Sequence, residues 1–468
     1  MFGLELDYTI LLLLCLLCAC VFEFINGFHD TANAVATVIY TNSMKPLVAV
    51  VWSGVFNFLG VFLGGISVAA GILKLLPPES LVDQTVAHNI SIVLALLVSA
   101  IIWNLATWRL GIPCSSSHTL IGSILGVGIV FSLLNGDTSL SGVNWSKAKE
   151  TGLSLLISPL MGFGFTMGLM ALLKYKVKTQ SIFKSPQADE VPKSWIRGLL
   201  IFTCTGVSFA HGSNDGQKGV GLIMLILISI APMHFALDQD KNPFEIQKPA
   251  QTALNGMIEL DGQLKDPLVK VQAERIKAEL FDINQILAKN SATQVVPVEE
   301  RLSLRKDILF VISNFEKLKK DGGFSKADKA TVKAIDHSLG QIKPLTSYAP
   351  TWVIFMVALS LGIGTMVGWK RIVVTIGEKI GKEHLTYAQG ASAELVAAGT
   401  IGLATITGLP VSTTQVLSSG VAGSMVASNG LSNLQSGTIK NIAIAWLLTL
   451  PITMILSGLL FLLFRQLF

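Results

Sequence analysis

Charge is scarce in this chain. Only 14% of its 468 residues are charged, whereas soluble proteins carry about a quarter. The formal net charge of +5 is small for this length and gives no indication of a nucleic-acid partner. Apolar residues, in contrast, make up 51% of the chain, and the mean hydropathy is +0.60. Several nearly uncharged windows are long enough to cross a hydrocarbon core of about 30 Å. The composition therefore excludes an ordinary soluble protein and predicts a polytopic membrane protein.

Cysteine is also sparse, and a signal-peptide pattern is missing. Two of the five cysteines, Cys15 and Cys18, have Cys-x-x-Cys spacing, but they lie in an apolar run without a second pair. We interpret them as small fillers of a membrane helix, so no disulfide framework is predicted. Glu5 and Asp7 precede this first apolar run, where a signal peptide would have basic residues. We therefore expect a retained first helix.

The apolar segments predict an all-α membrane protein. Because several segments are long or interrupted by glycine, we expect about 10–12 transmembrane helices. The segments lie at residues 8–25, 46–73, 87–108, 119–134, 151–173, 196–232, 349–369, 385–406, 410–428 and 438–464.

A hydrophilic stretch interrupts this pattern at 233–348. It contains no membrane-length apolar run, but apolar residues such as Leu254, Met257 and Leu260 recur at helical spacing. We expect a water-facing helical insert there, whose role and membrane side the sequence leaves open.

Two polar motifs each occur twice. Residues 27–34 read Gly-Phe-His-Asp-Thr-Ala-Asn-Ala, and residues 212–219 read Gly-Ser-Asn-Asp-Gly-Gln-Lys-Gly. Residues 111–118 read Gly-Ile-Pro-Cys-Ser-Ser-Ser-His, and residues 408–415 read Gly-Leu-Pro-Val-Ser-Thr-Thr-Gln. The interval between the two motifs is longer in the second half, by nearly the length of the hydrophilic stretch. Chance is a poor explanation for this agreement.

The motifs therefore indicate two repeated halves. We divide the chain into an N-terminal membrane repeat (1–173), a basic connector (174–195), the start of a C-terminal repeat (196–232), the insert (233–348) and the remainder of that repeat (349–468). Repeated halves with broken helices are typical of secondary transporters, whose substrate sites lie where the breaks meet. We expect the two repeats to be inverted relative to each other.

Asp30 and Asp215 are candidate cation-binding residues. A carboxylate at bilayer depth costs at least about 2.5–3.5 kcal/mol and needs a partner. Neither motif contains an arginine, so a proton or Na⁺, held with help from Asn33 or Asn214, would serve. The alternative is helix capping by the aspartates. We favour the cation interpretation because the aspartate occurs in both motifs.

The hydroxyl clusters are candidate anion sites. Each follows a Gly-x-Pro break and opens a new apolar helix, so free N–H groups and hydroxyls are available together. Two such helix starts could bind a tetrahedral oxyanion without arginine, although each alone could be an ordinary capped helix. The clusters are Ser115, Ser116 and Ser117 in the first half, and Ser412, Thr413 and Thr414 in the second.

Four further polar residues are secondary candidates. Lys218 could meet the anion, or it could pair with Asp215 or Glu23. Glu394 could relay protons or have a structural partner. His118 could donate to the anion or sense protonation, but Gln415 takes its place in the second half. Histidines flank both aspartates, yet no metal-ligand spacing emerges, so we predict no bound metal and no cofactor.

In these motifs the chain resembles the PiT family of inorganic phosphate transporters, most closely its bacterial low-affinity branch. The resemblance implies import of inorganic phosphate across the inner cell membrane by symport, with a proton more than with Na⁺. It implies that Asp30, Asn33, Asn214 and Asp215 act at the cation site. It also implies that Gln217 and both hydroxyl clusters contact phosphate.

The resemblance also implies that a divalent cation can travel with phosphate as a neutral complex. A homodimer in the lipid bilayer is a further candidate property. The chain departs from the family pattern at Gln415, where histidine is frequent, and at Phe28 and His29 in the first motif. These departures affect the coupling ion more than the fold.

Three alternatives stay open at this point, and one of them, a passive anion channel, would be excluded by uphill accumulation. The same architecture could carry sulfate, although only phosphate can donate a hydrogen bond to a carboxylate near neutral pH. A more remote alternative is an intramembrane hydrolase that uses Ser115 or Ser117 with His118. The second half repeats the hydroxyls without a histidine, which argues against an enzyme.

Overall fold

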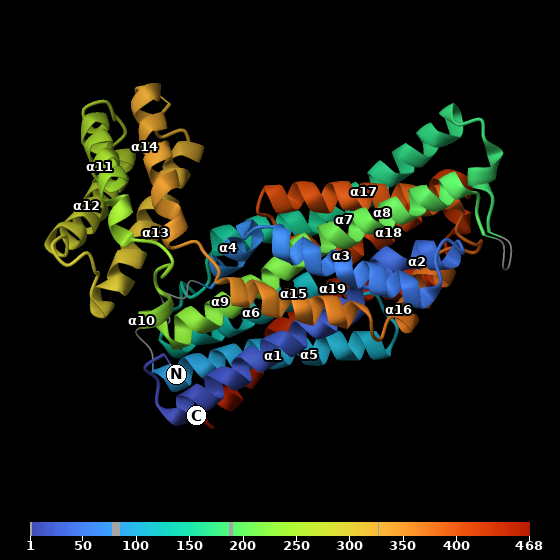
Figure 1. Cartoon of the computed structure of the whole chain (residues 1–468), viewed down its shortest axis with the longest axis horizontal. Helices are drawn as coiled ribbons and strands as arrows, with labels where there is room; N and C mark the ends of the chain where they lie inside the picture. Colours follow the sequence, from blue (N-terminus) through green and yellow to red (C-terminus); the bar gives the residue numbers. More distant parts are fainter. Residues whose placement is uncertain (1, 77–84, 187–190, 326) are drawn as a thin grey trace. The chain divides into compact units, whose positions relative to one another are not determined.

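The computed structural model describes residues 2–76, 85–186, 191–325 and 327–468, so part of the predicted connector, 187–190, lies outside the described residues. Over these ranges the regular structure is helical, apart from an isolated bridge between Gly381 and Leu434. The chain separates into two compact units (Figure 1). One, here called the membrane unit, contains Leu6–Ile226 and Pro350–Phe468. The other, the hydrophilic unit, contains Met1–Glu5 and Leu227–Ala349.

The membrane unit consists of long apolar helices and shorter, broken ones. Its first part contains α1 (Leu6–Asp30), α2 (Ala32–Tyr40), α3 (Pro46–Leu63), α4 (Ser67–Leu73), α5 (Val86–Arg109), α6 (Ser116–Leu134) and α7 (Trp145–Lys176). Its second part contains α8 (Ser194–His211), a π-helical turn (Gly212–Gly216), the greater part of α9 (Gln217–Ile230), α15 (Thr351–Thr365), α16 (Lys370–Val374), a second π-helical turn (Thr375–Lys379), α17 (Tyr387–Ile406), α18 (Thr413–Asn429) and α19 (Ser436–Phe464).

By length and composition, six helical segments of the described chain can cross a membrane, or seven if a pair bent by 58° counts as one span. The bent pair is α15 with the segment Lys370–Lys379. Helices α15 and α18 have only 15 and 17 residues. The expected total of about 10–12 spans stays a prediction, because it requires short and broken helices to cross as well.

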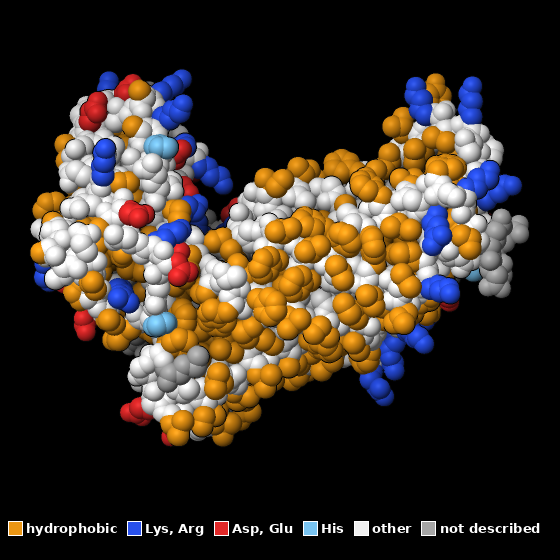
Figure 2. Space-filling model, viewed as in Figure 1, with side chains coloured by type: hydrophobic (Ala, Val, Ile, Leu, Met, Phe, Trp, Pro, Cys, Tyr) orange, Lys and Arg blue, Asp and Glu red, His pale blue; other side chains and the backbone are white. Residues whose placement is uncertain are grey.

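The outer surface of the membrane unit suits contact with lipid. Apolar side chains cover the face shown in Figure 2, while Lys and Arg side chains gather at the end where α2 and α16 lie. Among the exposed side chains are Leu156 and Leu160 of α7, and Leu447 and Leu459 of α19. In water such a continuous apolar surface would favour association. In a bilayer it is the expected outer surface.

Helix packing follows the same scheme in both parts of the membrane unit. Helix α1 packs against α15 as α8 packs against α3, and α7 packs against α18 as α19 packs against α6. Glycines allow the first two contacts: a Cβ atom at Gly27 would lie 2.4 Å from the Leu361 carbonyl oxygen, and one at Gly212 would lie 2.1 Å from that of Asn57. This correspondence supports the repeat, while the inverted orientation of the halves stays a prediction.

The hydrophilic unit is a bundle of amphipathic helices: α10 (Pro232–Phe235), α11 (Gln247–Asp261), α12 (Pro267–Lys289), α13 (Val298–Lys320) and α14 (Lys329–Ile342). The residues at helical spacing, including Leu254 and Met257, lie in its core. Buried Arg305 donates to the carbonyls of Ala236 and Thr346, at 3.0 and 2.8 Å. The guanidinium of Arg305 therefore holds together the segment before α11 and the segment after α14.

Candidate functional site

The two aspartates of the repeated motifs lie side by side in the membrane unit. Asp30 and Asp215 are 2% and 1% exposed, and Nε2 of His211 lies 3.5 Å from a carboxylate oxygen of each. The Thr413 hydroxyl lies 3.4 Å from Asp30 Oδ2 and 3.3 Å from Asp215 Oδ2. Both halves of the chain thus contribute to one buried polar centre.

Each aspartate is positioned by an interruption of its helix. Helix α1 ends at Asp30, and the next residue, Thr31, donates its hydroxyl to the carbonyls of Gly27 and Thr365, at 2.6 and 2.9 Å. In the second motif the interruption is the π-helical turn that contains Asp215. Such turns are frequent at functional sites, because they alter the side-chain register within a helix.

The two hydroxyl clusters have matching backbone geometry. Gly111 and Gly408 adopt φ values of 67° and 68°, a left-handed conformation that suits glycine after a helix. Four residues further on, Ser115 and Ser412 each cap the next helix by accepting a backbone N–H at 3.2 Å. The sequence predicted helix starts at both places, and α6 and α18 begin there.

Most hydroxyls of these clusters already have partners within the protein. Thr414 donates to Asp30 Oδ1 at 2.5 Å, and Ser117 donates to the Val411 carbonyl at 2.8 Å. The hydroxyl of Ser116 is buried and has no hydrogen-bond partner among the residues that the structure describes. Ser116 is therefore a hydroxyl at the start of α6 that is available to a ligand without breaking an existing bond.

The amide side chains behave differently from one another. Asn33 donates to Thr414 Oγ1 at 3.2 Å and so lies one bond from Asp30. Asn214 bonds the hydroxyl of Thr405 at 3.1 Å and the carbonyl of Leu409 at 3.2 Å, which ties it to the break before α18. Gln217, in contrast, accepts from the Val68 amide and donates to the Gly64 carbonyl. The structure thus holds it on the α3–α4 connection, and its phosphate contact stays a prediction.

Of the partners that the sequence left open for Lys218, the structure shows Asp215. Its Nζ lies 2.6 Å from Asp215 Oδ1 and also contacts Ser117 Oγ and the Val411 carbonyl. Glu23 instead accepts from Asn26 at 3.3 Å, and one of its buried oxygens has no hydrogen-bond partner.

Glu394 links the two motif-bearing segments. It is fully buried and accepts hydrogen bonds from Thr37 of α2 and Thr203 of α8. No basic side chain forms an ion pair with it among the described residues. It therefore has hydroxyl partners, and a proton-relay role stays a prediction.

His118 pairs with a serine of its own hydroxyl cluster. Its Nδ1 is 2.7 Å from Ser115 Oγ, and with Gln415 it lines a cavity of about 380 Å³. The other walls are apolar residues of α7 and α19, among them Leu155 and Trp446. The residues that follow the two hydroxyl clusters thus face a common, mostly apolar cavity.

His211 is the residue that sequence reasoning undervalued. Its Nδ1 contacts Asn57 Oδ1 at 2.8 Å, while the Asn57 amide donates to Thr365. Since Asn57 Oδ1 only accepts, Nδ1 carries a proton and Nε2 faces the two carboxylates without a hydrogen-bond partner. The possible ligand atoms of Asp30, His211 and Asp215 lie within 4.8 Å of one another.

This grouping can accept a cation. Either a proton on His211 or a metal ion between the three groups would satisfy the two carboxylates. Sequence spacing indicated no metal ligands, because Asp30 lies far from the others along the chain. The available signal was the four-residue interval between His211 and Asp215, which places both on one face of a helix.

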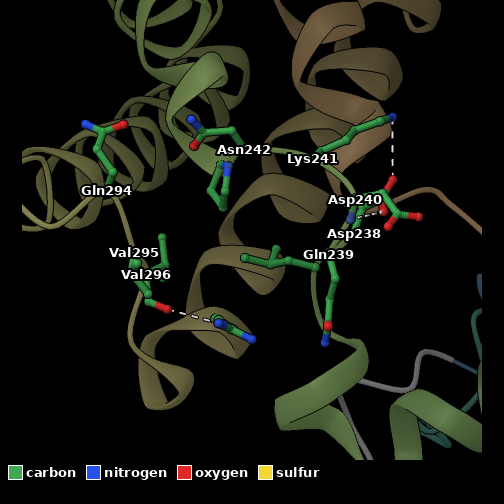
Figure 3. Close-up of a pocket in the computed structure, with 11 residues that line it drawn as sticks. Asp238, Gln239, Asp240, Lys241, Asn242, Gln294, Val295 and Val296 are labelled. Atoms are coloured by element: carbon green, nitrogen blue, oxygen red, sulfur yellow. Dashed lines mark hydrogen bonds and ion pairs between the residues drawn. The ribbon is translucent and has the colours of Figure 1, made fainter.

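The hydrophilic unit has a separate cleft of about 410 Å³ (Figure 3). Asp238 and Lys241 lie on one side, where their charged groups are 3.6 Å apart, and Gln294 and Val296 lie on the other. Arg301 bonds the Val296 carbonyl at 3.1 Å. None of the predicted site residues lines this cleft.

Comparisons with known proteins identify the family. A family model described as "Phosphate transporter family" matches residues 26–457. The low-affinity inorganic phosphate transporter PitA of Escherichia coli (strain K12) is 42% identical, with 97% of each chain covered. That of Buchnera aphidicola subsp. Acyrthosiphon pisum is 41% identical over 98% of this chain and 97% of the relative.

The fold is similar to that of a solved structure described as "The sodium-dependent phosphate transporter", with a TM-score of 0.55 and 20% identity over 98% of this chain and all of that one. The family match covers both motif pairs and nearly the whole chain. The chain is therefore a multi-pass membrane protein that belongs to the phosphate transporter family.

Proposed function

We propose that this protein imports inorganic phosphate by symport with a cation, a proton more than Na⁺. The observation that supports this function best is the convergence of Asp30 and Asp215 with the second hydroxyl cluster at one buried centre. Close relatives carry the name low-affinity inorganic phosphate transporter. Because these relatives are transporters, the hydrolase alternative is not proposed.

The helix starts supply the anion-binding groups. The first turns of α6 and α18 provide N–H groups, and their dipoles favour a negative ligand. Ser116 adds an unpartnered hydroxyl. Because no arginine takes part, phosphate would be held by hydrogen bonds and could be released again.

The hydrogen bonds of Asp30 suggest how cation and phosphate are coupled. The hydroxyls of Thr413 and Thr414 now point at this carboxylate. A proton or Na⁺ that binds Asp30 would weaken these bonds and free the hydroxyls to donate to phosphate. Cation binding would thus prepare the anion site, which is the linkage that symport requires.

Two finer points belong to the same proposal. The nitrogen and oxygen ligands of Asp30, His211 and Asp215 suit a divalent cation that enters with phosphate as part of the substrate. Alternating access would follow from rocking of the motif-bearing helices around this centre. Location in the inner membrane, and assembly as a homodimer, accompany the proposal as expectations.

Sulfate is the second candidate substrate. Near neutral pH phosphate carries a proton that it can donate to a carboxylate, whereas sulfate carries none. The two adjacent carboxylates therefore favour phosphate over sulfate.

Uptake into proteoliposomes tests the proposal. Labelled phosphate would be supplied while proton and Na⁺ gradients are imposed separately, with excess sulfate as competitor. We expect accumulation with an inward proton gradient, weak competition by sulfate, and loss of gradient-driven uptake in Asp30→Asn. Accumulation of sulfate in place of phosphate would contradict the substrate, and uptake that never exceeds equilibrium would indicate a passive channel.

A further inference from the structure

The ammonium group of Lys218 is fully satisfied inside the membrane unit. It contacts Ser117 Oγ at 2.5 Å, Asp215 Oδ1 at 2.6 Å and the Val411 carbonyl at 2.8 Å, and the residue is 3% exposed. A lysine ammonium has three N–H donors and no acceptor, whereas a neutral amine has only two donors. Three acceptors therefore fit the charged form, and none of them is Glu23.

Lys218 occupies a position where the two motifs differ in charge. It follows Asp215 by three residues, and at the same distance after Asp30 the first motif has Asn33. Asn33 is neutral and donates to Thr414, which in turn donates to Asp30. The first motif therefore supplies its aspartate with no lysine or arginine.

The surroundings of Asp30 confirm this difference. Among the described residues, its ion-pair partners are the rings of His29 and His211, each at 3.5 Å, and they include no lysine or arginine. The ring nitrogens that face it, Nδ1 of His29 and Nε2 of His211, have no hydrogen-bond partner in the same part of the chain. Asp215 also faces His211, but its other oxygen is neutralised by Lys218.

We propose that Lys218 is a tethered substitute for a coupling cation. In the second half it fills the place that an incoming cation takes beside Asp30 in the first half. The pair of aspartates therefore recruits one cation from solution for each phosphate, and not two. This inference rests on the proposed symport and adds the number of cations that the aspartates bind.

Substitution of Lys218 by asparagine tests the idea, because it gives the second motif the residue of the first. Purified protein in proteoliposomes would be brought to steady-state phosphate accumulation at a series of imposed membrane potentials and cation gradients. The slope of the logarithm of accumulation against potential reports the net charge moved per phosphate. Other carboxylates such as Glu394 contribute the same transported charge in wild type and variant. The difference between the two slopes therefore gives the change in the number of cations bound at the aspartates.

For Lys218→Asn we expect a slope larger by one charge, since Asp215 then needs a cation from solution. Lys218→Arg keeps the tethered charge and should retain the wild-type slope. The double variant Asp215→Asn/Lys218→Asn removes both charges and should also retain it. An active Lys218→Asn variant with the wild-type slope would overturn the proposal.

The reciprocal variant, Asn33→Lys, carries the test if Lys218→Asn does not fold. A lysine beside Asp30 should remove the cation that this aspartate recruits, so the slope should be smaller by one charge than that of the wild type. An active Asn33→Lys variant with the wild-type slope would also overturn the proposal. Failure of the symport itself is distinguishable, because wild-type protein would then show no dependence on any cation gradient.

Discussion

The two halves of the membrane unit have the same helix breaks and caps, but they differ in the charged residues at those breaks. Both have an interrupted helix with an aspartate, and both have a left-handed glycine followed by a serine cap. The first half places Asn33 after its aspartate, whereas the second places Lys218 there. Only the second half is interrupted by the long insert that forms most of the hydrophilic unit.

This comparison separates what the architecture needs from what the transported ions need. The caps and close glycine contacts occur twice because they set the helix geometry. The charged residues differ because the centre is shared, so one half can supply a group that the other lacks. The following predictions test this division, from the largest expected effect to the smallest.

Removing the partner of the tethered lysine should have the largest effect. Asp215→Asn leaves the Lys218 ammonium buried without a counter-charge, which costs about 3–5 kcal/mol. Thermal unfolding of the purified protein should show a marked loss of stability, with recovery when Lys218→Asn is added. Asp30→Asn, which strands no lysine, should lose much less stability. Equal losses for both aspartates would contradict the charge difference between the halves.

The paired glycines should be equally intolerant of a side chain. Alanine at Gly27 or Gly212 would place Cβ against a backbone carbonyl of the neighbouring helix, and overpacking of this kind costs up to about 3 kcal/mol. The unfolding midpoint should fall by a similar amount in both variants. Gly164→Ala serves as the control, because no atom lies within 4 Å of its added Cβ. A loss at only one of the two glycines would show that the halves are not packed alike.

The hydrophilic unit should depend on its buried arginine. Arg305→Met removes the bonds to Ala236 and Thr346, and we expect a loss of about 2 kcal/mol from hydrogen bonds to a charged donor. Hydrogen exchange of the full-length protein should show faster exchange in α13, with the long apolar helices unchanged. Arg275→Met, at an exposed position of α12, should have no such effect. Faster exchange across the membrane unit would show that the insert stabilises both halves.

The smallest predicted effect is a pH dependence within the same unit. Burial, together with a hydrogen bond to Glu279, raises the pKa of Asp307 from 3.8 to about 7. The folded state then binds more protons at Asp307 than the unfolded state between these values, so the stability that Asp307 contributes is full below pH 4 and is lost as the pH rises through 7. After solvent screening the change is about 1 kcal/mol.

Hydrogen exchange in α13 at pH 5 and pH 8 measures this change. Asp307→Asn should flatten the dependence by removing the titrating group. An unchanged dependence in that variant would assign the effect to another residue.

The sequence predicted those features that depend on local pattern. The start of α6 at Ser116 and that of α18 at Thr413 followed from proline and hydroxyls after a glycine. The helical spacing of apolar residues in the hydrophilic stretch predicted a helix, and helix α11 lies there with Leu254 and Met257 buried. Such features need only neighbouring residues, so one sequence suffices.

Side-chain partners were less predictable, because they come from distant parts of the chain. Gln217 lies next to Lys218 in sequence, yet it bonds the connection after α3, while Lys218 reaches Ser117 and Val411. The orientation of His211 depends on Asn57. These contacts of Gln217, Lys218 and His211 cannot be recognised from residue spacing or from composition.

The junction of the hydrophilic unit has a practical consequence. The amide of Asp238 bonds the carbonyl of Leu345 at 2.9 Å, and Arg305 holds both neighbouring segments. The chain therefore leaves and returns at nearly one point. A fluorescent protein or a rigid imaging scaffold whose own ends lie close together could therefore be inserted in place of 239–344 through short linkers. The fusion would report conformational changes of the transporter.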